Sequence, residues 1–140
     1  RHIGAENVAV LQGKTYDIMA HADATAVTSG TATLECGILG TPMVIVYRTS
    51  PLTYAIGRLL VDVENIGMIN IVAGKRIVPE LWQNAVTPTA ISEHIASICS
   101  DPLLQKTMKQ DLGNVLDKLG DTGASMRAAT VALSMLDIVV

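Results

Sequence analysis

Residues 42–47 form the most constraining segment of this 140-residue chain, because every one of them is apolar. A strand with one face in water alternates apolar and polar residues, whereas a strand covered on both faces is apolar throughout. Gly40 and Pro42 mark the end of a preceding helix, and Arg48 closes the segment. The pattern therefore predicts a strand in a parallel sheet that helices cover on both faces.

Strand and helix patterns alternate before this segment, in the order strand 7–11, helix 16–22, strand 24–28 and helix 31–39. After it, a capping residue followed by proline predicts three helix starts, at Ser50-Pro51, Thr87-Pro88 and Asp101-Pro102. Residues 66–74 are predicted as a short strand or extended loop, and residues 78–83 as one helical turn.

Residues 104–119 keep helical spacing, and a glycine-containing break at residues 120–123 separates them from a last helix. The whole order predicts one doubly wound α/β domain over residues 1–140. In such a domain, ligands lie outside the carboxyl ends of the strands.

Composition excludes several classes of protein. Hydrophobic residues make up 49% of the chain and charged residues 16%, which excludes a disordered segment. No uncharged run approaches the roughly 20 residues that span a bilayer. The net charge is −3, the basic residues are scattered and aromatic residues make up only 3%, so no nucleic-acid partner is predicted.

The two cysteines, Cys36 and Cys99, have neither the spacing of a zinc site nor that of a disulfide framework. We expect both to be reduced thiols in the core of a cytosolic protein. The chain begins at Arg1 rather than Met, and its first 13 residues do not resemble a signal peptide. These features predict a piece of a longer protein.

The residues that best carry chemistry follow the strand predicted at residues 24–28. A helix start there offers unpaired N–H groups to an anion, and Gly30 lets the anion approach closely. Ser29, Thr31 and Thr33 add hydroxyl donors. Glu35 shares a helical face with Thr31, where it can accept both hydroxyl protons of a ribose. The arrangement suits a nucleoside diphosphate, although the same residues also suit a plain helix cap.

Other polar residues are candidates for the same site, and each also has an interpretation that involves no ligand. Arg48 ends the apolar strand, where it either binds phosphate or is simply solvated. Asn70 interrupts an apolar run, so its amide needs hydrogen bonds from the backbone or from a ligand. Glu80 and Gln83 are predicted to lie on one helical turn, facing either the cleft or solvent.

The chain lacks the common nucleotide-binding fingerprints, both the glycine-rich loop that ends in Gly-Lys-Ser/Thr and GxGxxG. None of its three histidines has an acid, serine or cysteine at triad or ligand spacing, so no catalytic base and no metal site is predicted.

Five segments in one order resemble the lipid-A-disaccharide synthase family: residues 29–35, 42–48, 50–54, 70–75 and 78–83. The resemblance covers only the carboxy-terminal domain of that family. It implies a Rossmann-like half of a glycosyltransferase of the GT-B type. One departure is Ile69, which stands where the family usually has proline and puts the shape of that loop in doubt.

The resemblance implies that this domain holds the UDP part of UDP-2,3-diacylglucosamine, which the full enzyme joins to 2,3-diacylglucosamine 1-phosphate with release of UDP. By position, Ser29, Gly30, Thr31 and Thr33 match the diphosphate turn, Glu35 the ribose contact and Asn70 a cleft asparagine. Arg48, Glu80 and Gln83 match family positions with less defined roles. No metal or other cofactor is implied.

The resemblance also places the enzyme at the cytoplasmic face of the bacterial inner membrane, with the acceptor and the general base in an amino-terminal domain. The chain alone would then bind without turnover. Residues 124–140 either pack on this domain or cross to the other one, and the apolar content predicts self-association. Two alternatives stay open: a domain like that of UDP-N-acetylglucosamine 2-epimerase, and an α/β domain without catalytic function.

Overall fold

A computed structural model of the chain describes residues 7–50, 53–54, 64–120 and 122–135. Its three strands form one parallel sheet in the order β1 (Thr25–Thr28), β2 (Met43–Tyr47) and β3 (Glu80–Trp82). Thr28 pairs with Val46, and Tyr47 pairs with Trp82, so the three strands end at the same edge.

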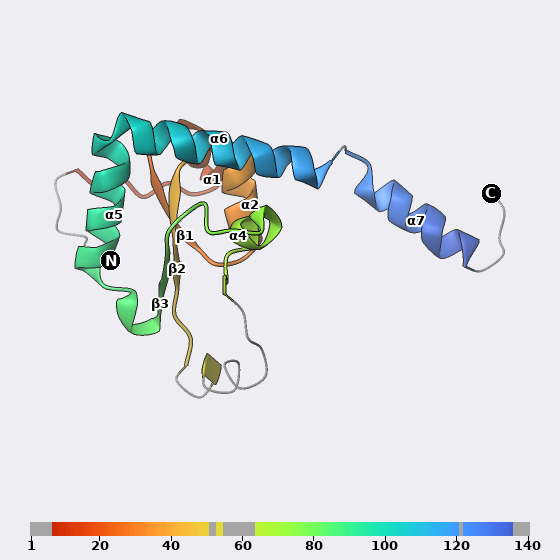
Figure 1. Cartoon of the computed structure of the whole chain (residues 1–140), viewed down its shortest axis with the longest axis horizontal. Helices are drawn as coiled ribbons and strands as arrows, with labels where there is room; N and C mark the ends of the chain where they lie inside the picture. The colour runs from red at the N-terminus through yellow and green to blue at the C-terminus, as the bar shows by residue number, and fades with distance from the viewer. Residues whose placement is uncertain (1–6, 51–52, 55–63, 121, 136–140) are drawn as a thin grey trace.

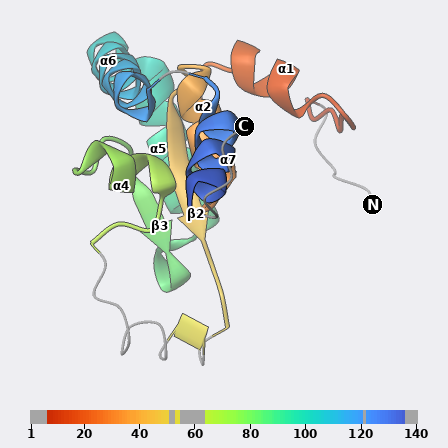
Figure 2. The same ribbon diagram turned by 90° about the vertical axis from the view of Figure 1, so that its right-hand side faces the viewer.

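The helices are α1 (Thr15–His21), α2 (Thr31–Ile38), α4 (Met68–Ala73), η1 (Gln83–Ala85), α5 (Pro88–Ser100), α6 (Pro102–Leu119) and α7 (Ala124–Ser134). Helix α5 contacts β1 and β2 from one face of the sheet, and α2 and α4 lie on the other face (Figure 1). Helix α6 packs against α2, α4 and α5. In Figure 2, α4 and α1 lie to the left and right of β2. The doubly wound, Rossmann-like α/β class predicted from the sequence is confirmed.

Strand β2 is the centre of the domain. Its first three residues, Met43, Val44 and Ile45, are fully buried, as the unbroken apolar segment predicts. Strands pair with it on both sides, and helices cover both of its faces. The core around it also includes Ile69 from α4, Ile98 from α5 and three residues of α6 (Met108, Leu112 and Val115).

The helix boundaries that capping residues predict are present in the structure. Thr87 accepts a hydrogen bond from the Ala90 N–H, and Asp101 accepts from the N–H groups of Leu103 and Leu104. Gly40, with φ of 70°, follows the end of α2 in the left-handed conformation that favours glycine. Ser50 accepts from the Thr53 N–H, but most of the helix predicted after it lies outside the described residues.

Three predictions of secondary structure are wrong. Residues 7–11 do not form a strand, and Val8, Val10 and Leu11 are more than half exposed, since no described strand pairs with them. Residues 68–73, predicted as a strand or extended loop, form helix α4, which ends at the left-handed Gly74. Residues 80–82, predicted as part of a helical turn, form β3, because pairing with β2 satisfies their backbone.

The two cysteines differ in environment. Cys36 is buried in the core as predicted, and burial raises the pKa of its thiol despite hydrogen bonds with Thr25 and Thr41 that lower it. Cys99, which was also expected in the core, is exposed on α5.

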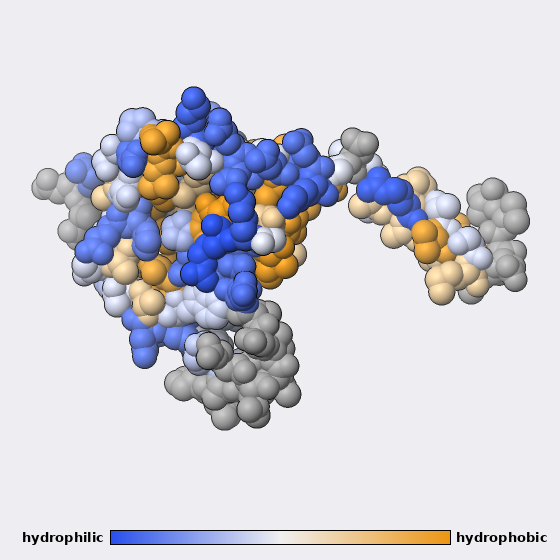
Figure 3. All heavy atoms as spheres, in the orientation of Figure 1, coloured by the Kyte–Doolittle hydropathy of each residue, from blue (hydrophilic) through white to orange (hydrophobic). Residues whose placement is uncertain are grey.

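Helix α7 extends away from the rest of the domain (Figure 1) and buries none of its residues. Apolar residues are visible on its surface in Figure 3, and Met126, Val131 and Met135 are all more than half exposed. Among the described helices, none combines the length and the apolar character needed to cross a membrane.

The packing predicts a sharp difference between two leucines of α6. Replacing the fully buried Leu112 with alanine should lower the free energy of unfolding by about 3 kcal/mol, because it leaves a cavity between α6, α2 and α4. Leu103 is 72% exposed, so Leu103→Ala should change stability by less than about 0.5 kcal/mol. Urea unfolding of both variants measures this, and equal losses would contradict the packing described.

Candidate functional site

Three of the predicted site residues meet at the carboxyl edge of the sheet. Ser29 directly follows β1, Arg48 follows β2 and Gln83 follows β3. Because the strands are parallel and in the register given above, these residues stand side by side at that edge. This is the edge at which open α/β sheets bind their ligands, as predicted from the sequence.

The turn from β1 into α2 leaves backbone donors open. Gly30 is the N-cap of α2, with φ of 149° and ψ of −164°. Residues other than glycine rarely adopt this conformation. Apart from Gly30 and its two chain neighbours, no heavy atom of the described residues lies within 4 Å of the position that a Cβ would take, so the space above Gly30 is open. The first N–H groups of a helix have no acceptor within it and carry its positive dipole end. This turn can therefore receive an anion.

The three hydroxyls of the turn are not equivalent. Ser29 Oγ donates to the Ile66 carbonyl over 2.7 Å, and Thr33 Oγ1 donates to the Gly30 carbonyl over 2.8 Å. Thr33 is also fully buried. Thr31 is exposed at the start of α2, and no described residue accepts its hydroxyl proton. Of the three hydroxyl donors predicted, Thr31 alone presents a free proton among the described residues.

Glu35 lies one turn further along α2 and has a partner that sequence analysis missed. The Tyr16 hydroxyl, on α1, donates to Glu35 Oε1 over 3.2 Å. The negative charge of Glu35, together with this hydrogen bond and slight burial, raises the pKa of Tyr16. No sequence signal points to the pair, because it joins two helices that β1 separates along the chain.

Asn70 is fully buried, and its amide group is satisfied within the protein. Its Oδ1 accepts from the N–H groups of Ile77 and Val78 at 2.8 and 3.1 Å. Its Nδ2 donates to the Val78 carbonyl at 2.9 Å and to Glu80 Oε1 at 2.7 Å. The sequence required partners for this embedded amide, and the structure supplies them from the backbone and from Glu80.

Glu80 and Gln83 also hydrogen-bond within the domain. Glu80, which is half-buried on β3, accepts from four donors: the N–H groups of Ile66 and Gly67, Asn70 Nδ2 and Trp82 Nε1. The contact of Trp82 with Glu80 was not predicted from the sequence, because residues 80 and 82 share a face in a strand but not in the helical turn expected there. Gln83 adopts φ of 47°, unusual for a residue other than glycine, and its Oε1 accepts from the Thr49 N–H at 2.9 Å. Gln83 thus ties the segment after β2 to the end of β3.

Arg48 is exposed at the end of β2, and none of the described residues pairs with its guanidinium. A guanidinium at a strand end beside an open helix N-terminus is suited to bind phosphate oxygens. The structure therefore keeps Arg48 available for the role predicted from the sequence.

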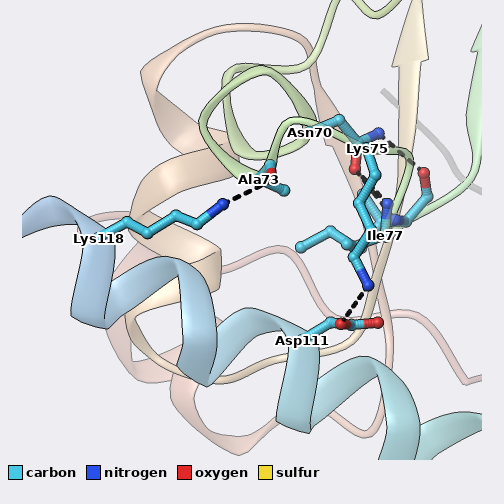
Figure 4. Close-up of polar contacts among 7 residues, drawn as sticks. Asn70, Ala73, Lys75, Ile77, Asp111 and Lys118 are labelled. Carbon is cyan, nitrogen blue, oxygen red and sulfur yellow. Dashed lines mark hydrogen bonds and ion pairs between the residues drawn. The ribbon is translucent and has the colours of Figure 1, made fainter.

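Helix α4 is held in place from α6, as Figure 4 shows. Lys118 Nζ donates to the Ala73 carbonyl at 2.8 Å, at the end of α4 where the helix dipole favours a positive charge. Lys75 forms an ion pair of 2.7 Å with Asp111, of which Lys75 is the more exposed partner. Such surface pairs contribute little alone. Alongside the packing of α4 against α6 and α2, they help to hold α4, and with it Asn70, against the domain.

Two further features complete the surroundings. A hollow of about 320 Å³ between α1 and β1 is lined mainly by apolar atoms and reaches Thr28 and Ala32 at the β1–α2 turn. Within the described residues, no group of three or more His, Cys, Asp and Glu side chains could hold a metal ion.

The model of the family described as lipid-A-disaccharide synthetase matches residues 4–134 of this chain. The chain belongs to this family. A lipid-A-disaccharide synthase of Syntrophus aciditrophicus is 47% identical over 129 residues, which are 92% of this chain and 34% of that protein. Lipid-A-disaccharide synthases of Geobacter metallireducens and Geobacter sulfurreducens are each 44% identical, over 96% and 93% of this chain.

The chain spans about a third of the length of the lipid-A-disaccharide synthases that it matches. The matching family is not the epimerase-like one that the sequence left open. Ile69, the residue where the family usually has proline, is the second residue of α4. Its N–H lies in the first turn of the helix, where it has no acceptor within the helix, so this position can also accommodate a proline.

The buried amide of Asn70 predicts a specific, pH-dependent effect. Asn70→Asp should lower the free energy of unfolding by about 3 kcal/mol at pH 7, because a carboxylate would face Glu80 Oε1 and the Val78 carbonyl. Burial and Glu80 would raise the pKa of the new carboxyl in the folded state. As the pH falls through that raised value the group is protonated and can donate again, so stability should partly return.

Urea unfolding at pH 7 and at pH 5 measures this effect, with Asn84→Asp at an exposed position as the control. An equal change in both variants, or a loss that grows on acidification, would show that the Asn70 hydrogen bonds do not hold this region together.

Proposed function

We propose that this chain is the donor-binding half of a glycosyltransferase that joins UDP-2,3-diacylglucosamine to 2,3-diacylglucosamine 1-phosphate, forming the lipid A disaccharide and releasing UDP. One observation carries the proposal: this chain, which belongs to the family, has an open β1–α2 turn at the carboxyl edge of its parallel sheet. Fold and family together favour a nucleotide ligand at that turn over a plain helix cap.

The diphosphate is assigned to the start of α2. The open space above Gly30, the N–H groups of the first helical turn and the free hydroxyl of Thr31 are donors that an anion can share. Arg48 approaches the same edge from β2 and adds a positive charge. Ser29 and Thr33 shape the turn through their own hydrogen bonds with Ile66 and Gly30.

The ribose is assigned to Glu35. A carboxylate one helical turn beyond the phosphate donors is far enough to avoid repelling the diphosphate and can accept from both ribose hydroxyls. The hydrogen bond from Tyr16 leaves Glu35 with acceptor capacity to spare, since each carboxylate oxygen can take more than one donor.

The chemistry assigned to this half is charge stabilisation. As the bond between the anomeric carbon and the UDP oxygen breaks, negative charge grows on the leaving diphosphate. The helix N-terminus, Thr31 and Arg48 are aimed at that charge, and in a closed cleft such donors can lower the barrier by several kcal/mol.

The remaining steps are assigned to the part of the enzyme beyond this chain. The acceptor hydroxyl attacks the anomeric carbon, and a base in an amino-terminal domain takes its proton. This chain is placed in the carboxy-terminal half, with α7 free to contact the other domain. The full enzyme is proposed to work at the cytoplasmic face of the inner membrane, where its acylated substrates reside, and homo-oligomers fit the exposed apolar surface.

Calorimetric titration of the chain with UDP and with ADP tests this proposal. The chain should bind UDP in preference to ADP without turning over the sugar donor. Glu35→Ala should weaken UDP binding about tenfold, because it removes a charged acceptor of two hydrogen bonds.

Glu93→Ala, on α5 at the opposite face of the sheet, is the matched control and should leave UDP affinity unchanged. If folded chain shows no UDP binding, or if Glu35→Ala binds UDP as well as the unaltered chain, the assignment of the donor site to this turn is wrong.

A further inference from the structure

We infer that Glu80 is a positioning residue whose carboxylate holds the β1–α2 turn in place through Ile66 and Ser29, and that it does not itself bind the nucleotide. This inference rests on the proposed function for its consequence on UDP binding, but its structural part stands on contacts within the chain.

The first argument is the saturation of the carboxylate. Oε1 accepts from the Gly67 N–H at 3.0 Å and from Asn70 Nδ2 at 2.7 Å. Oε2 accepts from the Ile66 N–H at 2.9 Å and from Trp82 Nε1 at 3.0 Å. Two donors on each oxygen fill the acceptor sites of a carboxylate. A ligand hydroxyl would have to displace one of these four bonds.

The second argument is a continuous path of hydrogen bonds from Glu80 to the β1–α2 turn. Ile66 donates its N–H to Glu80 and accepts the Ser29 hydroxyl on its carbonyl. Ser29 in turn donates its N–H to the Val46 carbonyl at 3.2 Å. The turn is therefore tied on one side to β2 and on the other to Ile66, and Glu80 fixes Ile66.

The third argument is the tight packing around Gly67, the residue next to Ile66. Gly67 is buried, and a Cβ built on it would overlap the side chain of Ile45 and lie 3.1 Å from Glu80 Oε1. Asn70, which shares Oε1, is itself locked to the backbone at Ile77 and Val78. A shift of the Glu80 carboxylate must therefore move the segment that carries Ile66.

The chemistry requires an acid at this position. All four partners are N–H donors, so a carboxylate satisfies each of them. The amide of Glu80→Gln would direct its own N–H₂ donors at two N–H groups and leave those unpaired. The substitution keeps the size of the side chain, which makes it a selective probe.

Amide hydrogen exchange tests the path without any ligand. In Glu80→Gln, the N–H groups of Ser29 and Thr33 in the turn should exchange at least about tenfold faster, along with that of Ile66. Glu93→Gln removes the same charge from an exposed position on α5 and should leave these rates unchanged. Faster exchange confined to Ile66 and Gly67 would overturn the inference.

Ser29→Ala tests the same path from its other end. It replaces Glu80→Gln as the probe if that variant does not fold. Loss of the Ser29 hydroxyl should speed exchange of the Ile66 N–H, although that group donates to Glu80 and not to Ser29. An unchanged rate at Ile66 would show that the two ends are not coupled.

The binding readout is the ratio of UDP affinity to uridine affinity, which reports the diphosphate contacts alone. Glu80→Gln should lower this ratio about fivefold or more, and the double variant with Ser29→Ala should lower it no further than the larger single effect. Additive losses would mean that Glu80 acts on the nucleotide by another route. If the unaltered chain does not bind UDP, the proposed function fails, while the exchange experiment still decides the role of Glu80.

Discussion

The burial of β2 on both faces is the constraint on which the rest of the structure depends. An apolar strand without a solvated face must be paired on both edges and covered on both sides, which brings β1, β3, α2, α4 and α5 around it. Parallel pairing then places the ends of all three strands at one edge. The candidate site follows from this geometry, since Ser29, Arg48 and Gln83 are the residues that leave the sheet there.

At that edge, polar groups divide into those that the fold uses and those that it leaves available. The carboxylate of Glu80, the amide of Asn70 and the hydroxyls of Ser29 and Thr33 are all hydrogen-bonded within the described part of the chain. Among the residues that the structure describes, nothing pairs with the N–H groups of Thr31 and Ala32, the Thr31 hydroxyl or the Arg48 guanidinium. The hydrogen-bonded groups hold the turn in place and the unpaired donors remain accessible, which is the arrangement that the proposed binding of a diphosphate needs.

The sequence predicted the features that depend on local pattern. The apolar segment before Arg48 identified β2, and capping residues such as Asp101 located the starts of α5 and α6. The turn at Gly30 was found because a strand, a glycine and a helix start follow each other directly along the chain. These signals are short-range, so a single sequence carries them.

The failures have physical causes that a local pattern does not contain. Residues 80–82 became a strand because β2 offered them partners, and this tertiary pairing overrode a weak helical pattern. The contact between Tyr16 and Glu35 joins residues that are close only after β1 and the two helices are placed. The roles of Asn70 and Glu80 were uncertain for the same reason, because their partners lie across the fold.

Nuclear magnetic resonance titration of the chain with UDP tests the central claim most directly, because it locates the diphosphate on the backbone. The account predicts that the amide signals of Gly30, Thr31 and Ala32 shift most, with smaller shifts near Glu35 and Arg48. Signals of exposed α5 residues such as Glu93 should stay in place. Saturating shifts confined to another surface, with the amides of the β1–α2 turn unmoved, would contradict it.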